Sequence, residues 1–207
     1  MGELNLSLPK NILDGTYLMQ NIWDNKNLVK IFKENVVAVM PTDTIYGIVG
    51  NALNVSVVNR IYSTRKRDPK KPCVILIGNI DELEKFSIVI SEKQKVILKK
   101  YWFNSSLPTS IVLDCPHEKF TYLHRGTQTL AFRLPTEESL RNLLKETGPL
   151  IAPSANPEGL PPSENISEAR KYFGDGVDLY VDGGEIKGKA SKVIELHKDG
   201  SVSILRK

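Results

Sequence analysis

A run of five apolar residues, 36–40, followed at once by a polar cluster, constrains the fold more than any other stretch of this chain. Most of the run is β-branched, which predicts a buried strand. Pro41 has no N–H to donate to a sheet, so we expect it to end the strand. The cluster that follows consists of hydroxyl and carboxylate side chains, an aromatic ring and a closing glycine: Thr42, Asp43, Thr44, Tyr46 and Gly47. Open α/β proteins often place a ligand where a strand ends in this way, although Asp and Thr also satisfy backbone groups in ordinary turns.

Strands and helices alternate along the rest of the chain. Apolar residues at helical spacing, with Asp24, a Ser91–Gln94 capping box and Thr136 as N-terminal caps, predict the helices. The predicted helices cover residues 24–32, 55–64, 81–86, 91–101, 136–148 and 167–173. Further strands are predicted at residues 73–78, 109–114, 129–134, 150–153, 178–182, 192–197 and 201–206, with a hairpin turn at 198–200.

No linker rich in Gly, Ser or Pro divides the chain. We therefore predict one α/β domain over residues 1–207, built on a mixed sheet of seven or more strands with flanking helices. Residues 1–20 carry little pattern, and we expect a loosely packed N-terminal arm there. No apolar run approaches the roughly 20 residues that span a bilayer, and the N-terminus lacks a secretory signal, so we expect a cytoplasmic protein without a membrane contact.

Charge and the metal-binding residue types limit the chemistry. A net charge of +4 permits an anionic partner, either nucleic acid or a phosphorylated small molecule. The three histidines are scattered, and no Cys/His spacing predicts a metal site. Two cysteines cannot form a disulfide framework. We expect Cys73, which stands in an apolar run, to be a buried hydrophobic residue, and a catalytic thiol is the alternative.

Residues 65–72 hold five cations in eight positions, between a predicted helix and a predicted buried strand. Cations at a helix C-terminus interact favourably with the helix dipole, by about 0.3–1 kcal/mol each, which accounts for one or two of them. A solvated charged face is the commonest meaning of such a run. Because two prolines hold this loop close to the sheet, we favour a polyphosphate as the counter-charge, with arginine contacting its oxygens.

A second polar step lies within residues 149–157, where a short strand between prolines leads into Ser154-Ala155-Asn156. Small residues let a ligand approach the backbone there, although a Ser or Asx turn has the same composition. Three weaker signals are a hydroxyl beside the start of a predicted strand, in two cases, and a cation near the end of the last one. They are Ser110, Ser191 and Arg206.

Taken in order, these segments resemble the YrdC/Sua5 family of threonylcarbamoyl-AMP synthases, from about residue 25 to residue 207. The resemblance rests on Pro-Thr-Asp-Thr-Ile-Tyr-Gly, Arg-x-Arg after the next helix, Pro-Thr-Ser-Ile-Val-Leu, Ala-Phe-Arg-Leu-Pro, Ala-Pro-Ser-Ala-Asn, Ser-x-Val and Ile-Leu-Arg. The first and fifth of these segments are highly specific as a pair. The implied fold is a twisted α/β domain of the YrdC/RibB type with a wide, concave basic face.

The reaction that the resemblance implies joins L-threonine, bicarbonate and ATP into threonylcarbamoyl-adenylate and pyrophosphate. A tRNA threonylcarbamoyl-transferase machinery then modifies adenosine 37 of tRNAs that read codons starting with A. The chain would thus be a nucleotidyltransferase, with Mg²⁺ brought by ATP, since no acidic cluster predicts a dedicated metal cage. Whether tRNA or double-stranded RNA is bound directly stays open.

Motif positions carry the family's site residues over to this chain. Threonine would contact Thr42, Arg133, Ala152 and Ser191. ATP would contact Arg65, Arg67, Ser110, Ser154, Asn156 and Arg206. The residues implied in catalysis, which would position two anions and stabilise charge on the phosphates, are Arg65, Arg67, Ser154 and Asn156. Asp43 is left out of the site, as a residue that caps the turn.

Three departures from the family pattern stand near the implied site. Arg65 replaces the usual lysine, Ser106-Leu107-Pro108 replaces a Pro-Gly-Pro turn, and Lys192 replaces threonine, either adding a cation beside the site or pointing to solvent. An inactive paralogue is therefore an alternative, as is a non-catalytic RNA-binding module, although aromatic stacking signatures are lacking. A carbamoyl-transfer domain of the hydrogenase-maturation type ranks lower, because this chain carries no zinc-finger cysteines.

Overall fold

The computed structural model describes residues 22–24 and 26–207, and the arm predicted at residues 1–20 lies outside them. Within these residues helices and strands are interspersed along the chain, as the sequence predicts. No helix in the described part of the chain is long and apolar enough to cross a membrane.

The chain's first two strands form a hairpin that the sequence did not predict. Strand β1 (Ala38–Pro41) pairs antiparallel with β2 (Tyr46–Asn51), and Pro41 lies opposite Tyr46. The expectation that Pro41 ends the strand is confirmed, because Pro41 is the last residue of β1. On its other side, β1 pairs with β7 (Leu179–Tyr180) only through its first two residues, so no neighbour there needs an N–H from Pro41. The polar cluster is reduced to a tight turn over residues 42–45.

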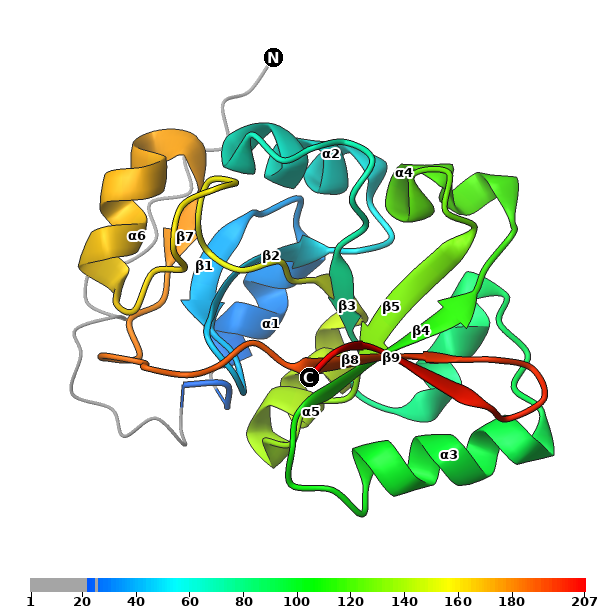
Figure 1. Ribbon diagram of the computed structural model, residues 1–207. Helices are drawn as coiled ribbons and strands as arrows, with labels where there is room; N and C mark the ends of the chain where they lie inside the picture. The colour runs from blue at the N-terminus through cyan, green and yellow to red at the C-terminus, as the bar shows by residue number, and fades with distance from the viewer. Residues whose placement is uncertain (1–21, 25) are drawn as a thin grey trace.

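The other strands lie where the sequence predicts them. They are β3 (Val74–Leu76), β4 (Thr109–Asp114), β5 (Thr129–Arg133), β6 (Leu150–Ile151), β8 (Lys192–Leu196) and β9 (Val202–Arg206). The sheet order is β7-β1-β2-β6-β3-β5-β4-β8-β9 (Figure 1). Three of the pairs are parallel (β1–β7, β3–β5, β4–β8) and the others are antiparallel, which confirms the predicted mixed sheet of seven or more strands.

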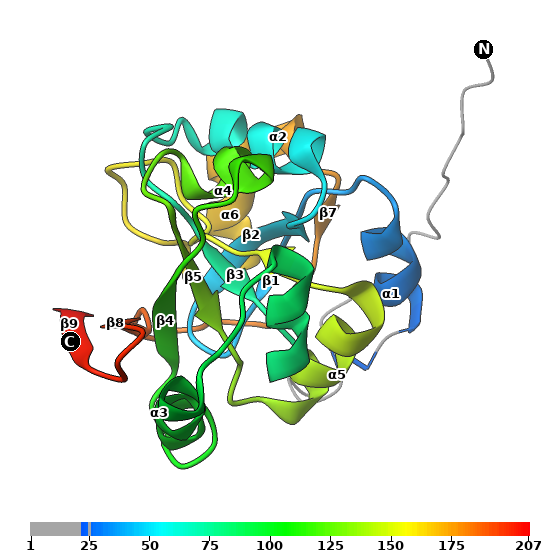
Figure 2. The ribbon, with the colours of Figure 1, turned by 90° about the vertical axis from the view of Figure 1, so that its right-hand side faces the viewer.

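Helices cover both faces of this sheet (Figure 2). The buried hydrophobic residues form two clusters. Helices α1 (Lys26–Lys33) and α5 (Glu138–Thr147) lie side by side on one face. The helices α2 (Val55–Arg65), α4 (Thr121–His124) and α6 (Ile166–Phe173) contribute to the other cluster, together with α3 (Glu92–Trp102) and a 3₁₀ helix at Ile80–Phe86. The short helix α4 was not predicted.

Two predicted helix caps have different outcomes. The capping box is confirmed, because the Ser91 hydroxyl accepts the N–H of Gln94 while the Gln94 side chain accepts the N–H of Ser91. The Thr136 cap is wrong, because α5 begins one residue later, after Glu137, and has no side-chain cap. The backbone N–H of Thr136 instead donates to Asp43, 3.2 Å away.

Phe132 tests the placement of the core. Its side chain is fully buried in β5 and meets Phe86 edge to face, with ring centroids 5.0 Å apart. We expect Phe132→Ala to lower the free energy of unfolding by about 3–5 kcal/mol, through lost burial and a residual cavity. Phe103→Ala is the control, because that ring is 59% exposed, and should change it by about 0.5 kcal/mol or less. Urea denaturation measures both, and equal losses would contradict the fold.

Candidate functional site

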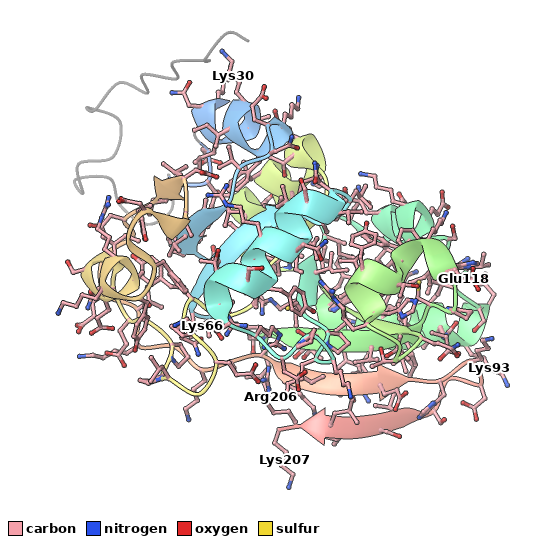
Figure 3. The ribbon with its side chains drawn as sticks, turned by 90° about the horizontal axis from the view of Figure 1, so that it is seen from above. Lys30, Lys66, Lys93, Glu118, Arg206 and Lys207 are labelled. Carbon is pink, nitrogen blue, oxygen red and sulfur yellow. The ribbon has the colours of Figure 1, made fainter. Side chains whose placement is uncertain are left out.

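A cavity of about 550 Å³ collects most of the predicted site residues. Its walls come from the turn between β1 and β2, the loop after α2, β5, the segment after β6 and the strands β8 and β9. Predicted site residues in its lining are Thr42, Arg67, Arg133, Ala152, Ser154, Ser191 and Arg206. Three arginines line the cavity, and no carboxylate from the described residues does. In Figure 3, Arg206 on β9 and Lys66 at the end of α2 lie on the same side of the molecule.

Arg133 is held at the end of β5 by a buried ion pair. Its Nη2 atom lies 2.8 Å from Asp43 Oδ1 and donates to Thr42 Oγ1 at 3.3 Å. The two side chains of the pair are 6% and 0% exposed. Burial lowers the pKa of Arg133, and the Asp43 carboxylate opposes that shift. Asp43, which was omitted from the predicted site, therefore orients Arg133. The sequence showed only a carboxylate next to Thr42, and such a residue is equally typical of an ordinary turn.

Thr42 both closes the turn between β1 and β2 and lines the cavity. Its hydroxyl donates to the carbonyl of Ile45 at 2.7 Å and lies 3.0 Å from the Thr44 hydroxyl. Thr44 is also buried and lines the cavity, although sequence reasoning did not select it. The turn thus presents two ordered hydroxyl groups beside Arg133.

Arg65 lies behind the cavity rather than in its lining. The side chain is only 2% exposed. Its Nε donates to the carbonyl of Asn156 at 2.8 Å, and Nη2 donates to Asn156 Oδ1 at 3.2 Å and Ser154 Oγ at 3.3 Å. Burial, with the charge of Arg67 nearby, lowers the pKa of Arg65 to about 10. Arg65 thus fixes the Ser154-Ala155-Asn156 step from below, and of that step Ser154 reaches the cavity.

The cations of the loop after α2 make different contacts. Arg67 lines the cavity, and its guanidinium donates to the carbonyls of Lys71 (3.0 Å) and Pro72 (2.9 Å), which folds the loop back. Lys71 forms an ion pair with Glu158 at 2.5 Å. Backbone carbonyls orient Arg67 without neutralising it, so its positive charge stays available to a ligand.

A second arginine is oriented in the same way at the other wall. Arg206 donates from Nε and Nη2 to the carbonyl of Ser191, at 2.9 and 2.7 Å. The Ser191 hydroxyl lies 2.8 Å from that of Ser110, which is fully buried and pairs in register with Arg133. Burial lowers the pKa of Arg206, and the positive charge of Arg133 lowers it further. This side of the cavity therefore favours an anion.

Lys192, one of the three departures, does not line the cavity. Its ammonium lies 5.6 Å from the ring centroid of Tyr101 in α3, and Lys100 lies 5.8 Å from the same ring. The backbone N–H of Lys192 donates to the carbonyl of Pro108 at 3.0 Å, which anchors the loop of the second departure. The third departure, Arg65, occupies the supporting position described above.

Cys73 lines the cavity but is buried, as predicted from its apolar surroundings. Burial raises the pKa of its thiol despite the nearby charge of Arg67, which disfavours the reactive thiolate at neutral pH. Among the described residues, no group of three His, Cys, Asp or Glu side chains could hold a metal ion. The arrangement therefore suits binding of anions by guanidinium and hydroxyl groups, without a nucleophilic side chain.

Comparison with known proteins gives a consistent result. Residues 30–207 match the Sua5/YciO/YrdC family, described as "Telomere recombination". Threonylcarbamoyl-AMP synthases of Bacillus subtilis and Pyrococcus abyssi are 31% and 29% identical over 74% and 84% of this chain, which correspond to 44% and 51% of theirs. The crystal structure of P. abyssi Sua5 complexed with L-threonine has a TM-score of 0.73 at 28% identity, covering 89% of this chain and 53% of that one. The chain thus spans about half the length of these relatives.

The Asp43–Arg133 pair predicts a specific pattern of stabilities. Arg133→Gln should lower the free energy of unfolding by about 3–5 kcal/mol, because it leaves a buried carboxylate without its partner. Adding Asp43→Asn removes the second charge and should restore most of that loss. Urea denaturation of the two single variants and the double variant measures the coupling. Additive losses would contradict a buried ion pair.

Proposed function

The chain belongs to the Sua5/YciO/YrdC family, and we propose that it makes threonylcarbamoyl-AMP and pyrophosphate from L-threonine, bicarbonate and ATP. The observation that carries this proposal is the cavity lined by three arginines and several hydroxyl groups, with no carboxylate from the described residues. The names of the relatives and the L-threonine complex of P. abyssi Sua5 support the same reaction. The product would serve a cytoplasmic tRNA threonylcarbamoyl-transferase, which modifies adenosine 37 of tRNAs that read codons starting with A.

We assign the threonine end of the cavity to Arg133 and the turn beside it. The guanidinium would pair with the substrate carboxylate, while Asp43 and Thr42 hold its Nη2 atom in place. Ala152 borders this end, and its N–H already donates to the carbonyl of Val74 at 2.8 Å. Ala152 would therefore contribute surface to the site rather than a donor from its amide.

We assign the phosphate end of the cavity to Arg67 and Arg206, and Ser154 lines the same cavity. Both guanidinium groups are oriented by backbone carbonyls, so each brings a full positive charge to the triphosphate. Arg65 supports this end indirectly, by holding Ser154 and Asn156 in position. In this assignment Arg65 and Asn156 are positioning residues rather than phosphate ligands.

The reaction needs positioning more than covalent chemistry. The neutral amine of threonine adds to bicarbonate with loss of water, or to carbon dioxide with loss of a proton, and gives a carbamate. A carbamate oxygen then forms a bond to the α-phosphorus of ATP as the bond from that phosphorus to the bridging oxygen breaks, and pyrophosphate leaves. Two anions that repel each other must be held together, and positive side chains in a cavity oppose that repulsion. No protein side chain forms a bond to the substrate in this scheme.

Mg²⁺ would enter with ATP. Protein-held Mg²⁺ prefers carboxylate ligands, and the described residues that line the cavity supply none. The site therefore does not fit a resident magnesium ion, and the steps proposed above involve only guanidinium and hydroxyl groups.

Pyrophosphate release separates this proposal from its alternatives. We expect release from ATP to require both L-threonine and bicarbonate. ATP turnover that ignores threonine would contradict the synthase. Salt-dependent binding of tRNA without any ATP turnover would favour the RNA-binding module, and the absence of both activities would indicate an inactive paralogue.

Arg67→Ala tests the phosphate end. We expect threonine-dependent pyrophosphate release to be abolished, because the cavity loses a cation that opposes the phosphate charge, while the circular dichroism spectrum stays unchanged. Lys70→Ala is the matched control, since Lys70 is an exposed cation of the same loop outside the cavity lining. Full activity of Arg67→Ala, or an equal loss in the control, would refute the assignment.

A further inference from the structure

The segment between β7 and β8, residues 182–191, runs from the edge strand β7 to β8, which lies next to the opposite edge strand β9 (Figure 1). We call this segment the strap. It contains no regular secondary structure, and most of its residues are exposed. Its last residue is Ser191, which lines the cavity and whose carbonyl orients Arg206. The strap thus connects an exposed, loosely bonded segment with the phosphate end of the site.

Tyr46, the first residue of β2, connects the strap to the β1–β2 hairpin. Its hydroxyl donates to the carbonyl of Gly184 at 2.9 Å and accepts the N–H of Gly183 at 2.8 Å. The Tyr46 ring is fully buried and also borders the cavity. Burial raises the pKa of Tyr46 to about 12, so the hydroxyl remains a donor at neutral pH. One side chain therefore makes both hydrogen bonds.

A second contact lies on the turn itself. A Cβ atom added to Gly188 would lie 1.7 Å from the carbonyl oxygen of Thr44, so only glycine allows the strap to rest on this turn. The N–H of Ile186 donates to the carbonyl of Glu164 at 2.7 Å, between the two contacts. The strap is therefore tethered at a few points, two of which lie on the hairpin that carries Thr42 and Thr44.

We propose that the strap closes the threonine end of the cavity and that Tyr46 is the positioning residue that latches it. The identity of the ligand, L-threonine, rests on the proposed function. An exposed segment with few hydrogen bonds opens at low free energy, and a ligand that fits only the closed form stabilises that form by its differential affinity.

The rate of limited trypsin digestion measures how readily the strap opens, because Lys187 and Lys189 lie exposed within it. We expect Tyr46→Phe to be cleaved at these lysines about tenfold faster than the wild type, since it keeps the ring and removes both hydrogen bonds. Tyr122→Phe is the matched control, because that hydroxyl binds the carbonyl of Ala52 (3.1 Å) outside the cavity. L-threonine should slow cleavage of the wild type and protect Tyr46→Phe less.

Kinetics distinguish a latch from a general loss of stability. Tyr46→Phe should raise the KM for L-threonine about tenfold and change the KM for ATP less than about twofold. Gly188→Ala should act in the same direction with the Tyr46 hydroxyl intact. Gly176→Ala is its control, because the added Cβ would meet only a Thr64 methyl group at 3.4 Å.

Each result bears on one part of the proposal. Cleavage of Tyr46→Phe at the wild-type rate would refute the latch. Faster cleavage without protection by threonine, in a protein that still releases pyrophosphate with threonine, would refute closure over that ligand. If the wild type releases no threonine-dependent pyrophosphate, the proposed function fails, whereas the comparison of cleavage rates still decides whether Tyr46 latches the strap.

Discussion

The buried ion pair between Asp43 and Arg133 is the interaction on which the rest of the site depends. It joins the β1–β2 turn to the end of β5, two segments that are not neighbours in the sheet. The same carboxylate accepts the N–H of Thr136, and the same guanidinium holds Thr42. A buried charge without a partner is strongly destabilising, so this pair specifies where the β1–β2 turn lies relative to the end of β5 as well as where the arginine points.

The cavity keeps its positive charge because carbonyl oxygens orient two of its arginines. Arg67 is bonded to the carbonyls of its own loop, and Arg206 to the carbonyl of Ser191. A carboxylate would fix these side chains equally well but would neutralise them. Burial, and after it the positive charge of Arg133, lower the pKa of Arg206, so its charged form is less favourable here than in water. A bound anion would offset the charge of the three arginines that line the cavity, which is why we connect this geometry with a nucleotide triphosphate and an amino-acid carboxylate.

Supporting residues lie one layer behind this surface. Arg65 sits below Ser154, Ser110 sits below Ser191, and Asp43 sits beside Arg133. Their shared feature is a buried polar group that contacts another part of the site, which restricts the movement of the group that lines the cavity. The replacement of lysine by arginine at position 65 fits this layer, because the fork reaches Ser154 and Asn156 together.

The sequence by itself determined the positions of most strands, the capping box of α3 and the segments that gather in the cavity, because strand periodicity, cap chemistry and short motifs are local properties. It did not determine β2, because Tyr46 and Gly47 carry the same local signal as a loop. Nor could it separate Asp43 as an ion-pair partner from Asp43 as a turn cap, or Arg65 behind the cavity from Arg67 within it. Those distinctions depend on contacts between residues about ninety positions apart, such as Thr42 with Arg133 and Arg65 with Asn156. Only the order of strands in the folded sheet brings such residues together, so the tertiary structure alone decided them.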